Sequence, residues 1–362
     1  MKSSANKVLL SGNHAIAEAA IRAGCHLYFG YPITPQNEIP EFMSEHLPKI
    51  KGGAFVQAES ELAAINMVLG AAATGRRVMT TSSSPGISLM QEGLSYLAAL
   101  ELPCVVANMV RGGPGLGNIA TSQSDYFQST RGGGHGDYRT ITLAPCTVQE
   151  IYDLTQLAFY LADKYRGPVI IQGEGLLGQM VEPVELRELD KKDLPPKDWA
   201  LTGAKDRPGR MLRSLILEEG ILEEHNWKLN RKYQEIEKRE KRFEAFRMED
   251  ANLAVIAYGS VARIAKGAIK RVREEGLKVG VVRPISLWPF PSEAIRKAAE
   301  RVSQFLVMEL SCGQMIEDVR LALEGKAEVN FYGRPGGGAI PNPAEFGRVI
   351  SRHYYQKVRK SR

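Results

Sequence analysis

The feature that most constrains the fold is a regular alternation of short apolar segments with longer segments of helical spacing. The short segments lie at 27–31, 54–57, 78–81, 104–109 and 168–172, and the helical ones at 13–24, 61–73, 87–99 and 148–165. Short continuous apolar runs are typical of strands that are buried on both faces. Strands of this kind separated by helices predict an α/β fold, in which helices cover both faces of a parallel sheet.

The same alternation returns in the last third of the chain. The expected strands there lie at 253–258, 278–282, 305–309 and 329–332, and the expected helices at 261–275, 292–302 and 314–323. A chain of 362 residues is long enough for two or three domains of roughly 100–200 residues each. We therefore predict a first α/β domain over 1–185, a linker and charged helix over 186–250, and a second α/β domain over 251–362.

Two predicted helices differ from the others in their polarity. The segment 221–250 is highly charged and carries a single apolar stripe. The stripe consists of Leu222, Leu229, Tyr233, Ile236 and Phe243. This pattern predicts a helix that lies on the protein surface, with partner binding as the alternative. The helix at 61–73 is apolar nearly all round, which is typical of a helix buried on all sides.

Composition excludes several kinds of protein. The four cysteines, Cys25, Cys104, Cys146 and Cys312, are too far apart in sequence for the short spacings that hold an iron–sulfur cluster or a structural zinc. We therefore expect no metal on this chain and a reducing, cytoplasmic location. A net charge of +6 could indicate nucleic acid, but no basic-aromatic motif of the known modules is present. No segment resembles a signal peptide or the ~20 apolar residues of a membrane span.

Three polar segments directly follow predicted strands, where ligands bind in open parallel sheets. The first is YPITP at 31–35, whose prolines stiffen the backbone around Thr34. On its own this segment is more typical of a rigid turn in which Thr34 caps the next helix.

The second segment is QAESE at 57–61, which runs into the apolar helix at 61–73. Acidic residues at a helix N-terminus are favoured by the helix dipole, so Glu59 and Glu61 are explicable as capping residues. Alternatively, one of the two carboxyls heads a buried helix and acts as an acid or base. The pattern alone does not decide between these alternatives.

The third segment is RGGPGLGN at 111–118. An arginine followed by glycines suits a carboxylate or phosphate, because it combines a bidentate cation with exposed backbone N–H groups. The alternative is a surface loop. A further glycine-rich loop at 132–137 contains His135, for which an ordinary loop position and contact with a ligand are equally consistent with the sequence.

Taken together, these segments resemble the alpha subunit of 2-oxoacid:ferredoxin oxidoreductases. The resemblance extends to SSSPGISL at 82–89, the loop at 132–139, LGQM at 177–180 and RPI at 283–285, and so covers nearly the whole chain. It implies that the first domain is the pyrimidine-binding domain of a thiamine diphosphate enzyme. The last domain would resemble the transketolase C-terminal domain.

The resemblance also implies roles for individual residues. Glu61 is expected to place its carboxyl against N1′ of the aminopyrimidine, with Glu59 as the second candidate. Thr34 and Arg111 are expected to bind the 2-oxoacid, with Arg111 facing its carboxylate. Pro32 and Ser84 are expected to contact the cofactor.

The family's diphosphate and magnesium motif, Gly-Asp-Gly followed by an Asn, is absent from this sequence. The resemblance therefore implies a beta subunit that supplies the diphosphate half of the cofactor site. It also implies gamma and delta subunits that carry [4Fe-4S] clusters, with ferredoxin and coenzyme A as reactants. The segments at 57–61 and 112–119 are most like the branch that acts on 3-methyl-2-oxobutanoate.

Three alternatives remain at this point. One is the 2-oxoglutarate branch of the same family, which usually has a Ser/Thr-rich loop after the arginine. Another is a non-oxidative thiamine enzyme, which would normally carry both halves of the cofactor site. The last is a non-catalytic scaffold subunit, which would purify without iron–sulfur partners.

Overall fold

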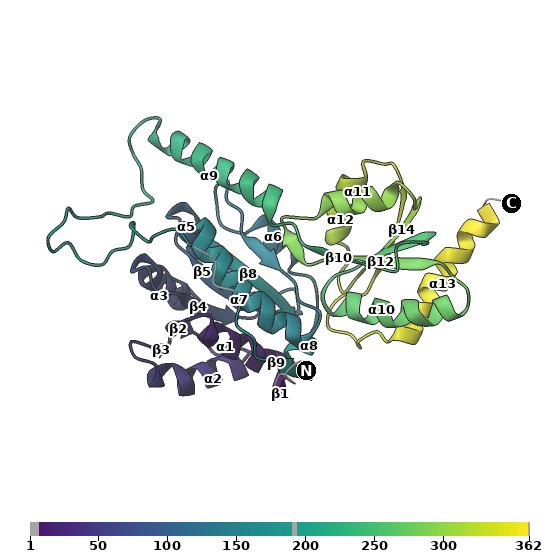
Figure 1. Cartoon of the computed structure of the whole chain (residues 1–362), viewed down its shortest axis with the longest axis horizontal. Helices are drawn as coiled ribbons and strands as arrows, with labels where there is room; N and C mark the ends of the chain where they lie inside the picture. Colours follow the sequence, from purple (N-terminus) through teal and green to yellow (C-terminus); the bar gives the residue numbers. More distant parts are fainter. Residues whose placement is uncertain (1–6, 190–193, 361–362) are drawn as a thin grey trace, which may run out of the picture.

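The chain folds into two α/β domains that lie side by side and are linked by a long surface segment (Figure 1). The computed structural model describes residues 7–189 and 194–360. The predicted α/β class is confirmed, because both large sheets are mostly parallel and are covered by helices. Residues 190–193 of the predicted linker lie outside the described residues.

The first sheet has the strand order β13-β7-β8-β5-β4-β2-β3, with β6 paired to the end of β5. The strands from β7 to β3 in this order are parallel, whereas β13 and β6 pair with their neighbours in antiparallel orientation. Their bounds are β2 (Leu27–Gly30), β3 (Ala54–Gln57), β4 (Val78–Ser82), β5 (Cys104–Gly112), β6 (Asn118–Thr121), β7 (Ile141–Leu143), β8 (Pro168–Glu174) and β13 (Ser286–Trp288). The carboxyl ends of the parallel strands consequently share one edge of the sheet.

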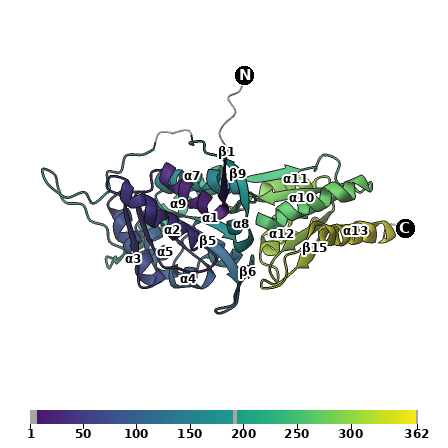
Figure 2. The same cartoon turned by 90° about the horizontal axis from the view of Figure 1, so that it is seen from below.

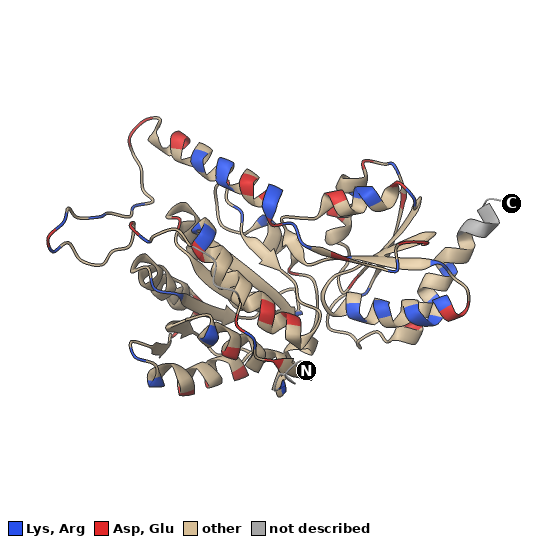
Figure 3. Cartoon of the chain, viewed as in Figure 1, with Lys and Arg blue, Asp and Glu red and all other residues tan. Residues whose placement is uncertain are grey.

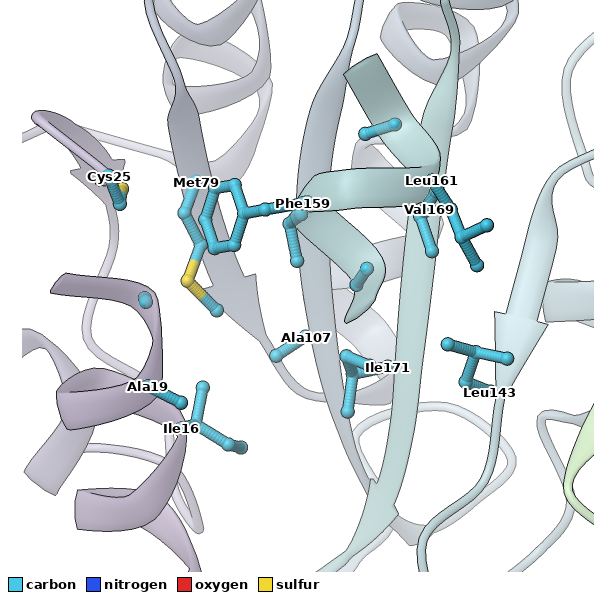
Figure 4. Packing of buried hydrophobic residues seen from close by; sticks show 14 of the residues in the cluster. Ile16, Ala19, Cys25, Met79, Ala107, Leu143, Phe159, Leu161, Val169 and Ile171 are labelled. Carbon is cyan, nitrogen blue, oxygen red and sulfur yellow. The ribbon is translucent and has the colours of Figure 1, made fainter. Parts of the chain in front are cut away.

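Helices cover both faces of this sheet. One face packs on α1 (Gly12–Arg22), α2 (Glu38–His46) and α7 (Val148–Tyr165), and the other on α3 (Glu61–Ala73), α4 (Ser84–Leu89) and α5 (Gln91–Ala99). The strand side chains alternate accordingly, since Val105 and Ile171 face the first layer and Val106 and Ile170 the second. Figure 4 shows Phe159 of α7 packed among the buried side chains of the first layer, which include Met79 and Ile171. Burying a side chain of this size contributes about 1.5–3 kcal/mol.

Short elements complete the first domain. A two-stranded antiparallel sheet joins the two ends of the domain, because β1 near the N-terminus pairs with β9 after the last long strand. The remaining elements are β1 (Lys7–Ser11), the 3-10 helix η1 (Leu47–Lys49), α6 (Tyr126–Arg131), α8 (Gly175–Gln179) and β9 (Val181–Glu185).

The second sheet has the order β10-β12-β11-β14-β15, in which only β10 is antiparallel to its neighbour. Its strands are β10 (Phe243–Phe246), β11 (Leu253–Ile256), β12 (Val279–Pro284), β14 (Gln304–Glu309) and β15 (Glu328–Gly333). Its helices are α10 (Gly259–Glu274), α11 (Ser292–Ala299), α12 (Met315–Leu323) and α13 (Pro343–Lys360). Figure 2 shows that α10 and α13 lie at the end of the molecule farthest from α3.

The predicted helix at 221–250 is too long. Helix α9 (Ile221–Arg239) ends eleven residues earlier, and the chain then forms the edge strand β10, which pairs with β12. Within the predicted stripe, Leu229, Tyr233 and Ile236 are buried, but Leu222 and Phe243 remain 46% and 48% exposed. Pairing with a strand some forty residues later in the sequence therefore overrides the local helical pattern.

Helix α9 packs across the end of the first domain, and its charges are visible in Figure 3. Lys228 and Lys232 both pair with the buried carboxylate of Glu101, which lowers the pKa of that carboxyl against the effect of its burial. His225 adds a hydrogen bond to the carbonyl oxygen of Ala99. The surface position predicted for this helix is confirmed by these contacts.

The prediction that the helix at 61–73 is buried on all sides is wrong for this chain. Helix α3 packs one face on the sheet, but Leu62 and Met67 on its other face are 44% and 37% exposed. The predicted helix at 87–99 is also divided, into α4 and α5, with Met90 between them. Among the described residues, no helix is both long enough and apolar enough to cross a membrane.

Candidate functional site

Four segments meet at the carboxyl edge of the first sheet. They are the loop after β2, the head of α3 after β3, the junction between β4 and α4, and the end of β5. These segments contain the predicted site residues Thr34, Glu61, Ser84 and Arg111. The parallel order β5-β4-β2-β3 brings them together, although they are far apart in the sequence.

Glu61 is the first residue of α3 and is 5% exposed. Its Oε1 accepts a hydrogen bond of 3.3 Å from the hydroxyl of Ser82, at the end of β4. The carboxyl also lies against the backbone of Gly86, because a Cβ added there would be 2.3 Å from Oε1. A larger residue than glycine at position 86 would therefore displace the carboxyl.

Glu59 differs from Glu61 in its surroundings, because its side chain is exposed to solvent. The N-cap of α3 is Ser60, whose hydroxyl accepts a hydrogen bond from the backbone N–H of Ala63. The capping task is thus performed by Ser60, and neither acid is needed for it. Burial at the head of α3 distinguishes Glu61 as the residue suited to contact a bound group.

Arg111 lies at the end of β5 and is 6% exposed. Its Nη1 donates to the carbonyl oxygen of Thr34 at 2.9 Å, and its Nη2 donates to that of Leu116 at 3.1 Å. A guanidinium has five N–H groups, so three remain available. Its Nε is buried and has no hydrogen-bond partner within the described part of the chain. The structure thus places Thr34 and Arg111 together and leaves the arginine able to bind an anion.

Ser84 lies at the start of α4 and is held by two neighbours. Its hydroxyl donates to Asp125 Oδ2 at 2.7 Å and accepts from the backbone N–H of Arg111 at 3.0 Å. Asn108 donates to the same Asp125 oxygen at 3.0 Å and accepts from the backbone N–H of Ser84. This network fixes the junction of β4 and α4 against the end of β5.

Asp125 and Asn108 are not among the site residues predicted from the sequence. Burial raises the pKa of the Asp125 carboxyl, and the hydrogen bonds from Asn108 and Ser84 oppose part of this increase. Asn108 carried a signal, because it is the polar residue within the otherwise apolar run 104–109. Asp125 carried none, since it follows an irregular segment far from Ser84 in the sequence.

The remaining predicted residues lie at the surface. Pro32 is exposed, as is Thr34 two residues later. His135 is exposed in its glycine-rich loop, which is fixed to α5 by a hydrogen bond of 2.7 Å from the backbone N–H of Gly133 to Gln91 Oε1. The loop is therefore ordered by α5, and no contact in the structure joins His135 to Glu61 or Arg111.

Residues 18–248 match the family model described as "Pyruvate flavodoxin/ferredoxin oxidoreductase, thiamine diP-bdg". The sequence is also 50% identical to the ketoisovalerate oxidoreductase subunit VorB of Methanothermobacter marburgensis, over 92% of this chain and 94% of that protein. The chain belongs to this family. Its members include subunits of 2-oxoacid:ferredoxin oxidoreductases, so this chain is a subunit of an oxidoreductase with partner subunits.

Other comparisons agree with the family. Residues 251–345 match the model "Pyruvate:ferredoxin oxidoreductase core domain II". The 2-oxoglutarate synthase subunit KorA of Methanothermobacter thermautotrophicus is 38% identical over 94% of this chain and 97% of that protein. A solved 2-oxoglutarate:ferredoxin oxidoreductase from Magnetococcus marinus has a TM-score of 0.83 and 27% identity, over 96% of this chain and 65% of that chain. The fold and family predicted from the sequence are thus confirmed.

Proposed function

We propose that this chain is the alpha subunit of a thiamine diphosphate-dependent 2-oxoacid:ferredoxin oxidoreductase acting on 3-methyl-2-oxobutanoate. The reaction would consume coenzyme A and ferredoxin and release an acyl-CoA, CO₂ and reduced ferredoxin. The observation that carries this proposal is the buried carboxyl of Glu61, at the same edge of the sheet as Arg111, whose buried Nε has no hydrogen-bond partner among the described residues.

The residues at the head of α3 fit the aminopyrimidine half of thiamine diphosphate. The cofactor supplies a stabilised carbanion at its C2 atom. In the proposed site, Glu61 holds a proton at N1′ of the pyrimidine, and Ser82 and Gly86 keep its carboxyl in place. A carboxyl in a water-poor position is suited to this transfer, because solvent does not compete for the proton.

Arg111 and Thr34 would bind the 2-oxoacid. The unpaired Nε of Arg111 offers a donor to the substrate carboxylate, while the Thr34 and Leu116 carbonyl oxygens fix the plane of the guanidinium. Ser84 would act through its hydrogen bonds to Asp125 and Arg111, which place the start of α4 beside the cofactor. The exposed Pro32 would contact the cofactor from the loop after β2.

The cofactor site would be completed by a beta subunit. Apolar side chains of the loop after β2, of β3, of α3 and of α4 remain exposed in this chain: Tyr31, Val56, Leu62, Met67 and Leu89. A patch of this kind is typical of a subunit interface. The diphosphate and magnesium ligands would lie on that partner, and [4Fe-4S] clusters on gamma and delta subunits, in the cytoplasm. The four cysteines of this chain are consistent with clusters elsewhere, since three are buried in separate places.

The substrate assignment is supported by the higher identity to a ketoisovalerate oxidoreductase subunit than to a 2-oxoglutarate synthase subunit. The loop after Arg111 contains no second cation for a distal carboxylate, and its larger side chains are Leu116 and Ile119. The alternative is 2-oxoglutarate, the ligand named for the solved relative. Rates of the assembled enzyme with both 2-oxoacids would decide between these substrates.

Calorimetric titration tests the shared site. The isolated chain is expected to bind thiamine diphosphate and magnesium weakly, because it lacks the diphosphate ligands. Co-expression with the beta subunit should restore tight binding. Micromolar or tighter binding by the isolated chain would contradict the shared site.

A further inference from the structure

Two glycine-rich loops from different domains touch beside Arg111. One is the hairpin 112–117, which joins β5 to β6, and the other is the loop 335–338, which follows β15. Asn118 Nδ2 donates to the carbonyl oxygen of Gly337 at 3.2 Å. A Cβ added to Gly112 would lie 3.0 Å from the backbone nitrogen of Gly337. The two backbones therefore approach as closely as glycine permits.

A second glycine of the C-terminal loop makes this approach possible. A Cβ added to Gly336 would lie 2.2 Å from the hydroxyl oxygen of Ser122 and 3.4 Å from the Cα of Gly112. By contrast, a Cβ added to Gly338 would meet no atom within 4 Å. Of these two glycines, Gly336 is therefore the one that the contact requires.

The hairpin, together with the carbonyl oxygen of Thr34, holds the guanidinium of Arg111. Arg111 directly precedes the hairpin, and its Nη2 donates to the carbonyl oxygen of Leu116 near the tip. The tip is not held by side-chain packing, because Leu116 is 80% exposed. Asn118 holds the base of the hairpin in place through two hydrogen bonds. Its Oδ1 accepts from the N–H of Ala120, and its Nδ2 donates to the carbonyl oxygen of Gly337. Contacts at the base thus orient the carbonyl group that binds the arginine.

We infer that the C-terminal domain, through the loop 335–338 and Asn118, positions Arg111 for the carboxylate of the 2-oxoacid. Gly336 and Asn118 are positioning residues in this arrangement, because they act on the substrate through the hairpin. The inference rests on the proposed function, in which Arg111 faces that carboxylate. It assigns to the second domain a part in substrate affinity.

The test compares Gly336→Ala with Gly338→Ala in the assembled holoenzyme. Both changes add one methyl group to the same loop, and neither glycine has a positive φ. Gly336→Ala is expected to lower kcat/KM for the 2-oxoacid by about 10- to 100-fold, mainly through KM, because the arginine is displaced. Gly338→Ala should match the wild type. The KM for coenzyme A and the affinity for thiamine diphosphate should be unchanged in both variants.

Hydrogen–deuterium exchange provides a readout that does not depend on activity. The backbone N–H groups of Gly113 and of residues 115–118 should exchange faster in Gly336→Ala than in Gly338→Ala. Equal exchange and equal KM in the two variants would overturn the inference. If Gly336→Ala does not assemble, Asn118→Ala removes the same contact without adding atoms, and the same two measurements apply to it.

Arg111→Lys separates failure of this inference from failure of the proposed function. Lysine keeps the charge but loses the planar fork, so kcat/KM should fall by about 10- to 1000-fold. If Arg111→Lys has this effect and Gly336→Ala has none, only the inference fails. If Arg111→Lys leaves KM unchanged, the role proposed for Arg111 fails, and the exchange of residues 113–118 alone then decides whether loop 335–338 positions the hairpin.

Discussion

Glu61 and Glu309 are both buried glutamates beside a helix N-terminus, but their hydrogen bonding differs. Glu309 ends β14 and accepts four hydrogen bonds, from the hydroxyl of Ser311 and from the backbone N–H groups of Gln314, Met315 and Ile316. Glu61 heads α3, and the hydrogen bond to it that the structure shows comes from Ser82 at 3.3 Å. The two carboxyls are 2% and 5% exposed, so burial does not distinguish them.

This difference separates a structural carboxylate from one available for chemistry. Glu309 satisfies the first N–H groups of α12, a task that a capping side chain often performs. At α3 that task belongs to Ser60, which leaves Glu61 with unused acceptor capacity. A buried polar group that the protein does not fully satisfy is costly, and a bound ligand can supply what is missing.

The largest effect is expected for Glu61→Gln. Glutamine keeps the shape of the side chain but cannot transfer the proton, so exchange of the C2 proton of thiamine diphosphate should slow by about 100- to 10,000-fold. The measurement is proton–deuterium exchange at C2 in the assembled enzyme, followed by quenching and NMR. Cofactor binding measured by calorimetry should change much less.

Glu59→Gln is the control for this prediction. Its side chain is exposed, so exchange at C2 should stay near the wild-type rate. Loss of exchange in this variant, with normal exchange in Glu61→Gln, would show that the two acids had been assigned in the wrong order. Normal exchange in both variants would remove this chain from the proton transfer.

In contrast to Glu61→Gln, Glu309→Gln should lower the stability of the protein and leave C2 exchange unchanged. The amide places N–H groups against the backbone donors of α12, so the free energy of unfolding should fall by about 2–4 kcal/mol. Exchange at C2 should be unaffected in enzyme that remains assembled. Chemical denaturation and C2 exchange on the same preparation give both quantities. A variant with unchanged stability but slowed C2 exchange would contradict the structural role of Glu309.

Asp125→Asn is expected to give the smallest effect, seen in the pH dependence of stability. Burial raises the pKa of this carboxyl, so its protonated form contributes to the free energy of unfolding. This contribution is fully present below the usual pKa of 3.8 and is lost as the pH rises through the raised pKa. The thermal midpoint of the variant should therefore fall less than that of the wild type as pH rises from acid to neutral. Parallel melting curves at every pH would contradict the raised pKa.

The sequence predicts local features of this protein better than long-range ones. Residue spacing is sufficient to predict α3 and α7, because their apolar residues lie within the elements and their N-cap residues directly precede them. It does not predict that Asp125 supports Ser84, or that Asn118 binds Gly337, which is 219 residues later. The end of α9 was misplaced for the same reason, since β10 is defined by its pairing with β12.

The predicted site residues also show that local patterns are easier to recognise than long-range contacts. Glu61 and Arg111 are recognisable because each lies in a polar segment at or just beyond the carboxyl end of a strand, and the parallel order of the sheet then brings these ends together. Helix α13 was not predicted at all, although Phe346 and Ile350 lie four positions apart and are both buried. The hairpin contacts depend on glycines, whose missing side chains give no periodic signal.

Strand β13 has a consequence for how the chain can be divided. Its residues follow β12 of the second sheet in sequence, yet they form the edge of the first sheet beside β7. Trp288 at its end packs edge-on against Tyr233 of α9. The first sheet, helix α9 and the segment after β12 are therefore in contact at this point. A protease cut in the exposed segment 201–220 would accordingly leave two fragments that stay bound to each other. Truncation after residue 250 would instead remove the edge strand β13 from the first sheet. The unpaired backbone groups of β7 would then favour aggregation.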